Sequence, residues 1–178
     1  MSAASVTHVE CPFALEMFIP SMPSSQPRAK VSRRNGIAMM YSPTTLGKGL
    51  DKRPHPVVEF RYAIKTAVQK MLPDDFVLLN CPLSVSLVFW FDRKPSLTKK
   101  TRPNPPLWKI SKPDRDNLDK SVLDCLTGVV WLDDNCVCDG RIQKAIVAPG
   151  QQPGVEIVIR EILADEQPES ILNRARHD

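Results

Sequence analysis

The chain has 178 residues, of which 42% are hydrophobic and 25% are charged. This length and composition are ordinary for a soluble globular protein with one hydrophobic core. The formal net charge is +4 and the pI is about 8.9, so the chain is mildly basic. No stretch reaches the roughly 18 apolar residues of a membrane helix, and no basic and apolar secretory signal opens the chain. The five scattered cysteines make a poor disulfide framework. We therefore expect no membrane partner and a reducing, cytoplasmic setting.

The N-terminal third is predicted to consist of short strands and loops. Pro20 stops a first strand-like run, and Asn35-Gly36 is a favourable hairpin turn between two further runs. The expected elements are a flexible leader at 1–12, a strand at 13–19, a Pro- and Ser-rich loop at 21–28, strands at Val31 and 37–41, and a loop at 42–52.

Two segments have the periodicity of helices. Apolar residues recur at steps of three and four over 56–71, and Pro73 ends this run. A second helix is predicted over 116–127, where Gly128 is placed to end it. The apolar face of the second helix is formed by Leu118, Val122, Cys125 and Leu126.

Further strands are predicted in the second half of the chain. The run 83–91 begins with alternation and ends fully apolar, which predicts a central strand. The segments 137–147 and 155–162 also have strand composition, and the Pro- and Gly-rich residues 149–154 between them predict that they form a hairpin. Trp131–Asp134 is expected to be a turn or short strand.

The organisation predicts one α+β domain, because strands and helices mix without a regular βαβ alternation. The domain is expected to span 13–162, with a mixed sheet and two main helices. The residues 93–112 are rich in prolines and cations and are predicted to form a long loop. A polar tail is expected at 163–178.

The basic residues gather in two stretches without acids, at 28–34 and at 93–112, and the acids follow around 114–139 and 156–169. A basic surface around an acidic site suits a protein that cleaves phosphodiester bonds. Two solvated basic loops explain the charge pattern alone equally well.

Asp114 and Asp116 lie at the predicted start of the second helix. One acid there could be an N-cap, because the first N–H groups of a helix are free and the helix dipole is positive. A cap needs only one carboxylate, however, and a third acid from the next element could close a site with this pair. Lys120 lies one turn after Asp116, so the two form either a surface ion pair or a lysine that binds phosphate beside a carboxylate cluster.

Clustered carboxylates repel unless a cation joins them, and their oxygens suit Mg²⁺ or Mn²⁺. An EF-hand calcium loop is excluded, because its sixth and twelfth positions would be Asp119 and Cys125 instead of Gly and Glu. Zinc is disfavoured, because Cys136 and Cys138 lack the usual spacing. Phosphate-binding glycine loops and a Ser-His-Asp order are absent.

The run Lys-Pro-Asp-Arg-Asp-Asn-Leu-Asp-Lys-Ser-Val-Leu-Asp-Cys-Leu-Thr-Gly at 112–128, followed by Val-Trp-Leu-Asp-Asp-Asn-Cys-Val at 130–137, resembles the core of the RusA-type crossover-junction endodeoxyribonucleases. The pattern of that family is Asp-x-Asp-Asn-Leu-x-Lys, then Asp-Ala-Leu, then Trp-x-Asp-Asp-x-x-Val. The resemblance extends more weakly over about 13–162. The basic loop at 93–112, the tail and Pro113 depart from compact members of the family.

The resemblance implies a compact α+β homodimer that cuts four-way (Holliday) DNA junctions symmetrically with Mg²⁺, for which Mn²⁺ can substitute. It implies that Asp114, Asp116 and Asp134 bind the metal and that Lys120 is the essential lysine. Asp133 is adjacent and could share the metal role, although neighbours on an extended segment face opposite ways. The expected DNA contacts are Arg28, Lys30, Lys112, Arg115, Arg141 and Lys144.

Several alternatives stay open. Asp124 is either a helix-surface acid or the partner of a nearby base, and Trp131 is expected in the core rather than stacked on a base. Arg141 and Lys144 are either phosphate contacts or merely solvent-exposed. A nuclease for other branched DNA and a non-catalytic junction-binding protein are the rival functions, and the family's frequent occurrence in prophages suggests a phage or prophage origin.

Overall fold

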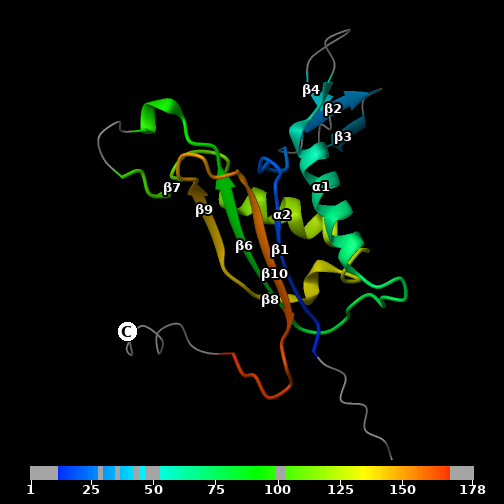
Figure 1. Cartoon of the computed structure of the whole chain (residues 1–178). Coiled ribbons are helices and arrows are strands. Elements are labelled where there is room, and N and C mark those ends of the chain that lie inside the picture. Colours follow the sequence, from blue (N-terminus) through cyan, green and yellow to red (C-terminus); the bar gives the residue numbers. More distant parts are fainter. Residues whose placement is uncertain are drawn as a thin grey trace, which may run out of the picture.

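The computed structural model describes residues 12–27, 30–34, 37–41, 45–46, 53–98 and 103–168 (Figure 1). Most of the expected leader, the turn Asn35-Gly36 and the contact residue Arg28 lie outside these ranges. No helix within the described part of the chain combines the length and the apolarity that crossing a bilayer requires.

A six-stranded mixed sheet forms one layer of the fold, with the strand order β1-β10-β6-β9-β7 and with β8 paired to one end of β6. Strand β6 is central, as predicted, and is parallel to β8 and β9 but antiparallel to β10. The strands are β1 (Ala14–Ile19), β6 (Leu83–Phe91), β7 (Leu107–Trp108), β8 (Val137–Asp139), β9 (Ile142–Ile146) and β10 (Gly154–Glu161).

Two helices, α1 (Pro56–Met71) and α2 (Arg115–Leu126), cover one face of this sheet (Figure 1). The bounds of α1 agree with the prediction, and α2 begins one residue earlier than predicted. The α+β class with a mixed sheet and two main helices is therefore confirmed.

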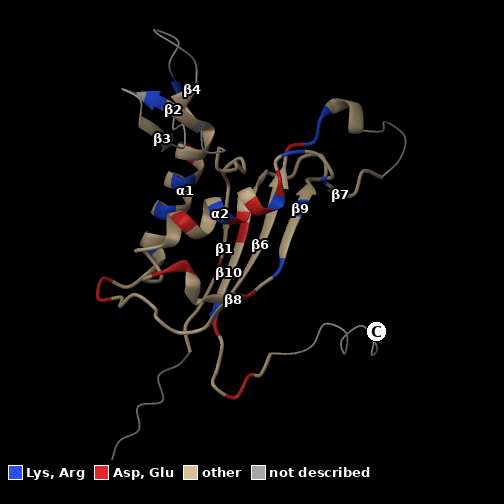
Figure 2. Cartoon of the chain, turned by 180° about the vertical axis from the view of Figure 1, so that it is seen from behind, with Lys and Arg blue, Asp and Glu red and all other residues tan. Residues whose placement is uncertain are grey.

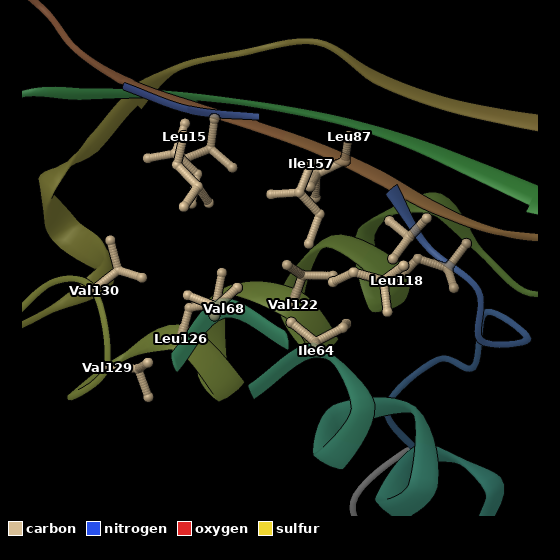
Figure 3. Close-up of a cluster of buried hydrophobic side chains, with 14 of the residues drawn as sticks. Leu15, Ile64, Val68, Leu87, Leu118, Val122, Leu126, Val129, Val130 and Ile157 are labelled. Carbon is tan, nitrogen blue, oxygen red and sulfur yellow. The ribbon is translucent and has the colours of Figure 1, made fainter. Parts of the chain in front are cut away.

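The hydrophobic core lies between the sheet and the two helices (Figure 3). Leu87 and Ile157 point from the sheet toward Ile64 of α1 and Val122 of α2, and all four side chains are fully buried. Trp131 is also fully buried, as predicted. The helical periodicity of the sequence therefore decides which face of each helix is buried.

The predicted hairpin between 137–147 and 155–162 is wrong, because β6 lies between β9 and β10 and pairs with both. Strand β6 is central, so the hydrogen-bonding groups on both of its edges need a partner strand, and β9 and β10 supply one each. The Pro- and Gly-rich connection between β9 and β10 therefore crosses over the end of β6 instead of turning tightly. The first segment is also broken into β8 and β9. At the break, Gly140 has a φ of 151°, and an added Cβ would lie 1.8 Å from the carbonyl oxygen of Val85.

Short elements occur in and around two of the predicted loops. In the first loop, a two-residue strand pairs with residues just before α1, and in the second loop a 3-10 turn precedes β7. The predicted strands around residue 35 are present and pair with each other. These elements are β2 (Lys30–Arg34), β3 (Ile37–Tyr41), β4 (Thr45–Leu46), β5 (Arg53–Pro54) and the 3-10 turn η2 (Pro95–Leu97).

Replacing Ile157 with Ala is expected to lower the free energy of unfolding by about 2–5 kcal/mol, because removing the fully buried side chain leaves a cavity under β10. Urea unfolding measures this change. The matched control is Val158→Ala on the opposite face of the same strand, where the side chain is 37% exposed; we expect a change of about 0.5 kcal/mol. Equal losses would contradict the assignment of the buried face.

Candidate active site

The first of the predicted site residues, Asp114, precedes α2 directly as its N-cap residue, with extended backbone angles of φ −71° and ψ 145°. Its side chain makes no capping hydrogen bond to the helix. Capping alone therefore does not account for an acid at this position. Asp116 lies in the first turn and is exposed, where the helix dipole favours a negative charge.

Asp116 and Lys120 project from the solvent-facing side of α2, because Leu118 and Val122 occupy the buried side. No ion pair joins these two residues, both of which the structure describes. The interpretation of Asp116 and Lys120 as a surface ion pair is therefore not what the structure shows. Both charged groups stay accessible to a ligand from solvent.

Lys144 of β9 fixes the segment that leads into Asp114. Its Nζ donates hydrogen bonds to the backbone oxygens of Ser111 at 3.1 Å and Pro113 at 2.6 Å. The backbone oxygen of Lys144 also accepts from the N–H of Lys109. The ammonium group of Lys144 is bonded to the carbonyl next to Asp114 and so positions the segment that carries this acid. The predicted contact of Lys144 with DNA stays a prediction.

A second set of contacts fixes α2 from the side of α1. The Arg61 guanidinium donates to Asp124 at 3.2 Å and to Gln26 at 2.9 Å, and the backbone N–H of Gln26 donates to the oxygen of Asn117. Asp124 is therefore the partner of a base. The loop that leads to Arg28 is tied to the first half of α2.

The sequence did contain a sign of this network. Arg61 follows Val57 by four residues and precedes Ile64 by three, so it lies beside the apolar stripe of α1. A cation at such a position is expected to have a partner.

Basic residues surround the N-terminal end of α2. Figure 2 shows acidic and basic residues together at this end, beside β9. A cleft of about 470 Å³ opens there, and its lining contains cations but no acid. Burial lowers the pKa of Lys109, and the nearby charges of Lys144 and Lys94 lower it further. The residues that line the cleft are Trp108, Lys109, Arg115, Gly140, Arg141, Ile142, Gln143 and Lys144.

A third carboxylate, that of Asp119, lies half-buried on α2. Burial raises its pKa, and the neighbouring charge of Arg115 acts in the opposite direction. Partial burial therefore makes its ionised form less favourable than it would be in water.

Asp133 and Asp134 lie at the far end of α2. Asp133 caps the 3-10 turn η3 (Asp134–Cys136), because its Oδ1 accepts a hydrogen bond from the N–H of Asn135 at 2.9 Å. The preceding Trp131 donates from Nε1 to the Oγ1 of Thr127 at the C-terminus of α2. With 12 residues, α2 is about 18 Å long, and this length lies between Asp114 and the segment that leads to Asp134.

The register of the sheet gives the same separation. Lys144, which binds the carbonyl of Pro113, pairs with Phe89, whereas β8, which follows Asp134 closely, pairs with Leu83. Six residues along β6 correspond to about 20 Å. One chain therefore does not bring Asp134 to Asp114 and Asp116, and no group of three His, Cys, Asp or Glu side chains placed to hold a metal occurs among the described residues.

The remaining predicted DNA contacts are only partly described. Lys112, Arg115 and Arg141 are exposed around the start of α2 and the edge of β9. Lys30 is the first residue of β2, but its side chain is outside the described part of the structure. The DNA-binding role of all four residues stays a prediction.

Lys144→Met is expected to speed hydrogen exchange of the backbone amides at 109–116 without DNA, because the carbonyls of Ser111 and Pro113 lose their common donor. Hydrogen–deuterium exchange read by mass spectrometry measures this rate. Lys112→Met is the control, because Lys112 is exposed on the same segment. If neither variant changes the exchange, Lys144 does not position this segment.

One family of known proteins is similar to this chain over most of its length. The sequence profile described as Endodeoxyribonuclease RusA matches residues 20–160, which include both helices, the complete strands β6 to β9 and most of β10. A comparison with curated proteins finds no match. The chain therefore belongs to the endodeoxyribonuclease RusA family.

Proposed function

We propose that the chain is a divalent-metal-dependent endonuclease that resolves four-way DNA junctions by paired, symmetric nicks. The observation that carries the proposal is the pair Asp114 and Asp116 at the start of α2, where capping does not use the first acid and the second is exposed beside a basic cleft. Membership of an endodeoxyribonuclease family supports DNA cleavage. The metal, the junction and the dimer belong to the proposal.

The chemistry of the donor groups fits a small, hard cation. Carboxylate oxygens are the ligands that Mg²⁺ and Mn²⁺ take in proteins, so Asp114 and Asp116 would hold the ion. When bound, such an ion lowers the pKa of an attacking water and stabilises the charge on the departing oxygen. Hydrolysis would leave 5′-phosphate and 3′-hydroxyl ends.

The cations near this pair have separate roles in the proposal. Lys120 lies one helical turn after Asp116 and is exposed, so its ammonium group can offset the negative charge that develops on the phosphate. Arg115, Lys112 and Arg141 can contact neighbouring phosphates, which positions the strand without reading its sequence.

The position of Asp134 gives the dimer a specific role. If Asp134 shares an ion with Asp114 and Asp116, it must come from a second copy of the chain, because one chain holds these acids at opposite ends of α2. A two-fold dimer then has two such composite sites. Two sites match the two opposed strands that must be cut to resolve a junction.

The rival functions give different products. A nuclease for flaps or other branched DNA needs no paired nicks at symmetric positions, and a junction-binding protein binds without any cutting in Mg²⁺ or Mn²⁺.

Asp116→Asn is expected to slow cleavage of a synthetic mobile four-way junction in Mg²⁺ by at least about 100-fold while junction binding survives, because a charged ligand is lost from an exposed position. Denaturing gels of end-labelled strands measure both nicks. Asp165→Asn is the control, because Asp165 lies on an exposed turn after β10. Binding without any metal-dependent nicks in the wild type would sink the proposal, and unpaired nicks would favour the flap nuclease.

Mixed dimers of Asp116→Asn and Asp134→Asn subunits are expected to recover nicking, although each variant alone is inactive. If the acids come from different chains, one of the two sites in the mixed dimer has a full set of wild-type carboxylates. If they come from one chain, both sites carry a defect and no activity returns. Differently tagged subunits, refolded together and purified through both tags, provide the sample.

A further inference from the structure

Trp108 is 69% exposed although it lies on a strand of the main sheet. An indole ring has a large apolar surface and is among the side chains most often used in recognition. Trp131, by contrast, is fully buried. The exposure of Trp108 therefore needs an explanation other than packing.

The segment that carries Trp108 is held in place. Strand β7 pairs with β9 through Leu107↔Ile146 and Trp108↔Ala145. Arg93 ties the chain that precedes this segment to the end of β9, because its guanidinium donates to the backbone oxygens of Leu97, Pro105 and Val147. The backbone around Trp108 is thus fixed while its ring stays largely exposed.

Trp108 contributes to the wall of the basic cleft described above. Strand β7 pairs with residues 145–146 of β9, and the N–H of Lys109 donates to the oxygen of Lys144, so this pairing ends before Arg141. The Gln143 amide, with its oxygen turned toward Arg141, accepts from Nε at 2.9 Å and from Nη2 at 2.8 Å, which holds the guanidinium at the cleft. The cleft thus combines an aromatic ring with several cations and no acid.

The cleft also adjoins the proposed site of cleavage. Arg115 lines the cleft and stands between Asp114 and Asp116 in the sequence. A DNA strand whose phosphate lies at the two acids would therefore have its neighbouring nucleotides within reach of the cleft. The positive lining attracts phosphates, and the volume of about 470 Å³ is within the range of small-ligand sites.

We propose that Trp108 is a stacking platform for an unpaired base next to the scissile phosphate, and that Arg115 and Arg141 hold the phosphates beside that base. This inference rests on the proposed function. Every base has a face that can stack on an aromatic ring, so the contact is independent of sequence. Bases inside a duplex are already stacked on each other, so Trp108 favours branched DNA over linear duplex.

The test is binding of the full chain to a fluorescent four-way junction and to a linear duplex of the same sequence, both in EDTA so that no cutting occurs. Trp108→Ala is expected to weaken junction binding about tenfold and to leave duplex binding unchanged. Trp108→Phe keeps a stacking face and should stay within about threefold of the wild type. Ile110→Ala is the matched control, because this residue is 98% exposed on the same segment and does not line the cleft.

The salt dependence separates the ring from the cations. Arg141→Ala is expected to reduce the slope of log K against log salt by about 0.9, the contribution of one phosphate contact, whereas Trp108→Ala should leave the slope unchanged.

Three outcomes would overturn the inference: Trp108→Ala binds the junction like the wild type, it weakens duplex binding equally, or sedimentation shows that it loses self-association in parallel with binding. The last result would assign Trp108 to an interface between copies.

The proposed function is judged separately by cutting in Mg²⁺. A wild type that cuts while Trp108→Ala binds normally removes only the stacking role, and a wild type that binds through Trp108 but never cuts removes only the nuclease.

Discussion

The burial of one face of α2 against the sheet is the interaction on which the rest of the structure depends. Leu118, Val122 and Leu126 are fully buried under the central strands. Because a helix turns by 100° per residue, this burial leaves Asp116 and Lys120 on the outer side. The same packing fixes the two ends of the helix, with Asp114 beside the edge of β9 and Asp134 beyond the opposite end.

Two sets of polar contacts hold α2 from different elements. Lys144 of β9 binds the carbonyls that precede Asp114, and Arg61 of α1 ties Asp124 to the loop at 21–27. The contacts of Lys144 also hold the segment that carries Lys109 and Lys112 and that leads to Asp114. The scaffold thus arranges charges of opposite sign side by side, which is the arrangement required to bind a phosphodiester backbone around a cation.

Much of the fold could be predicted from the sequence, because helical periodicity and the apolar run at 83–91 are local signals. The strands that pair with β9 and β10 could not be predicted, because the composition of a connection does not say whether it turns tightly or crosses a third strand. The acids at the start of α2 and the buried Trp131 were also predictable from local pattern. The distance from Asp114 to Asp134 depends on the direction of α2 along the sheet. The hydrogen bonds of Lys144 could not be predicted either, because the two carbonyls that it binds lie 31 and 33 residues away in the sequence.

Whether Asp114 and Asp116 hold a divalent ion is tested most directly by anomalous X-ray diffraction from crystals of the full chain grown with Mn²⁺. We expect a peak about 2.1 Å from carboxylate oxygens of both residues. An Asp134 carboxylate from a second copy at the same peak would complete the proposed composite site. A peak at other residues only, from protein that cuts junctions in the same Mn²⁺ solution, would contradict the assignment of the metal to the first turn of α2.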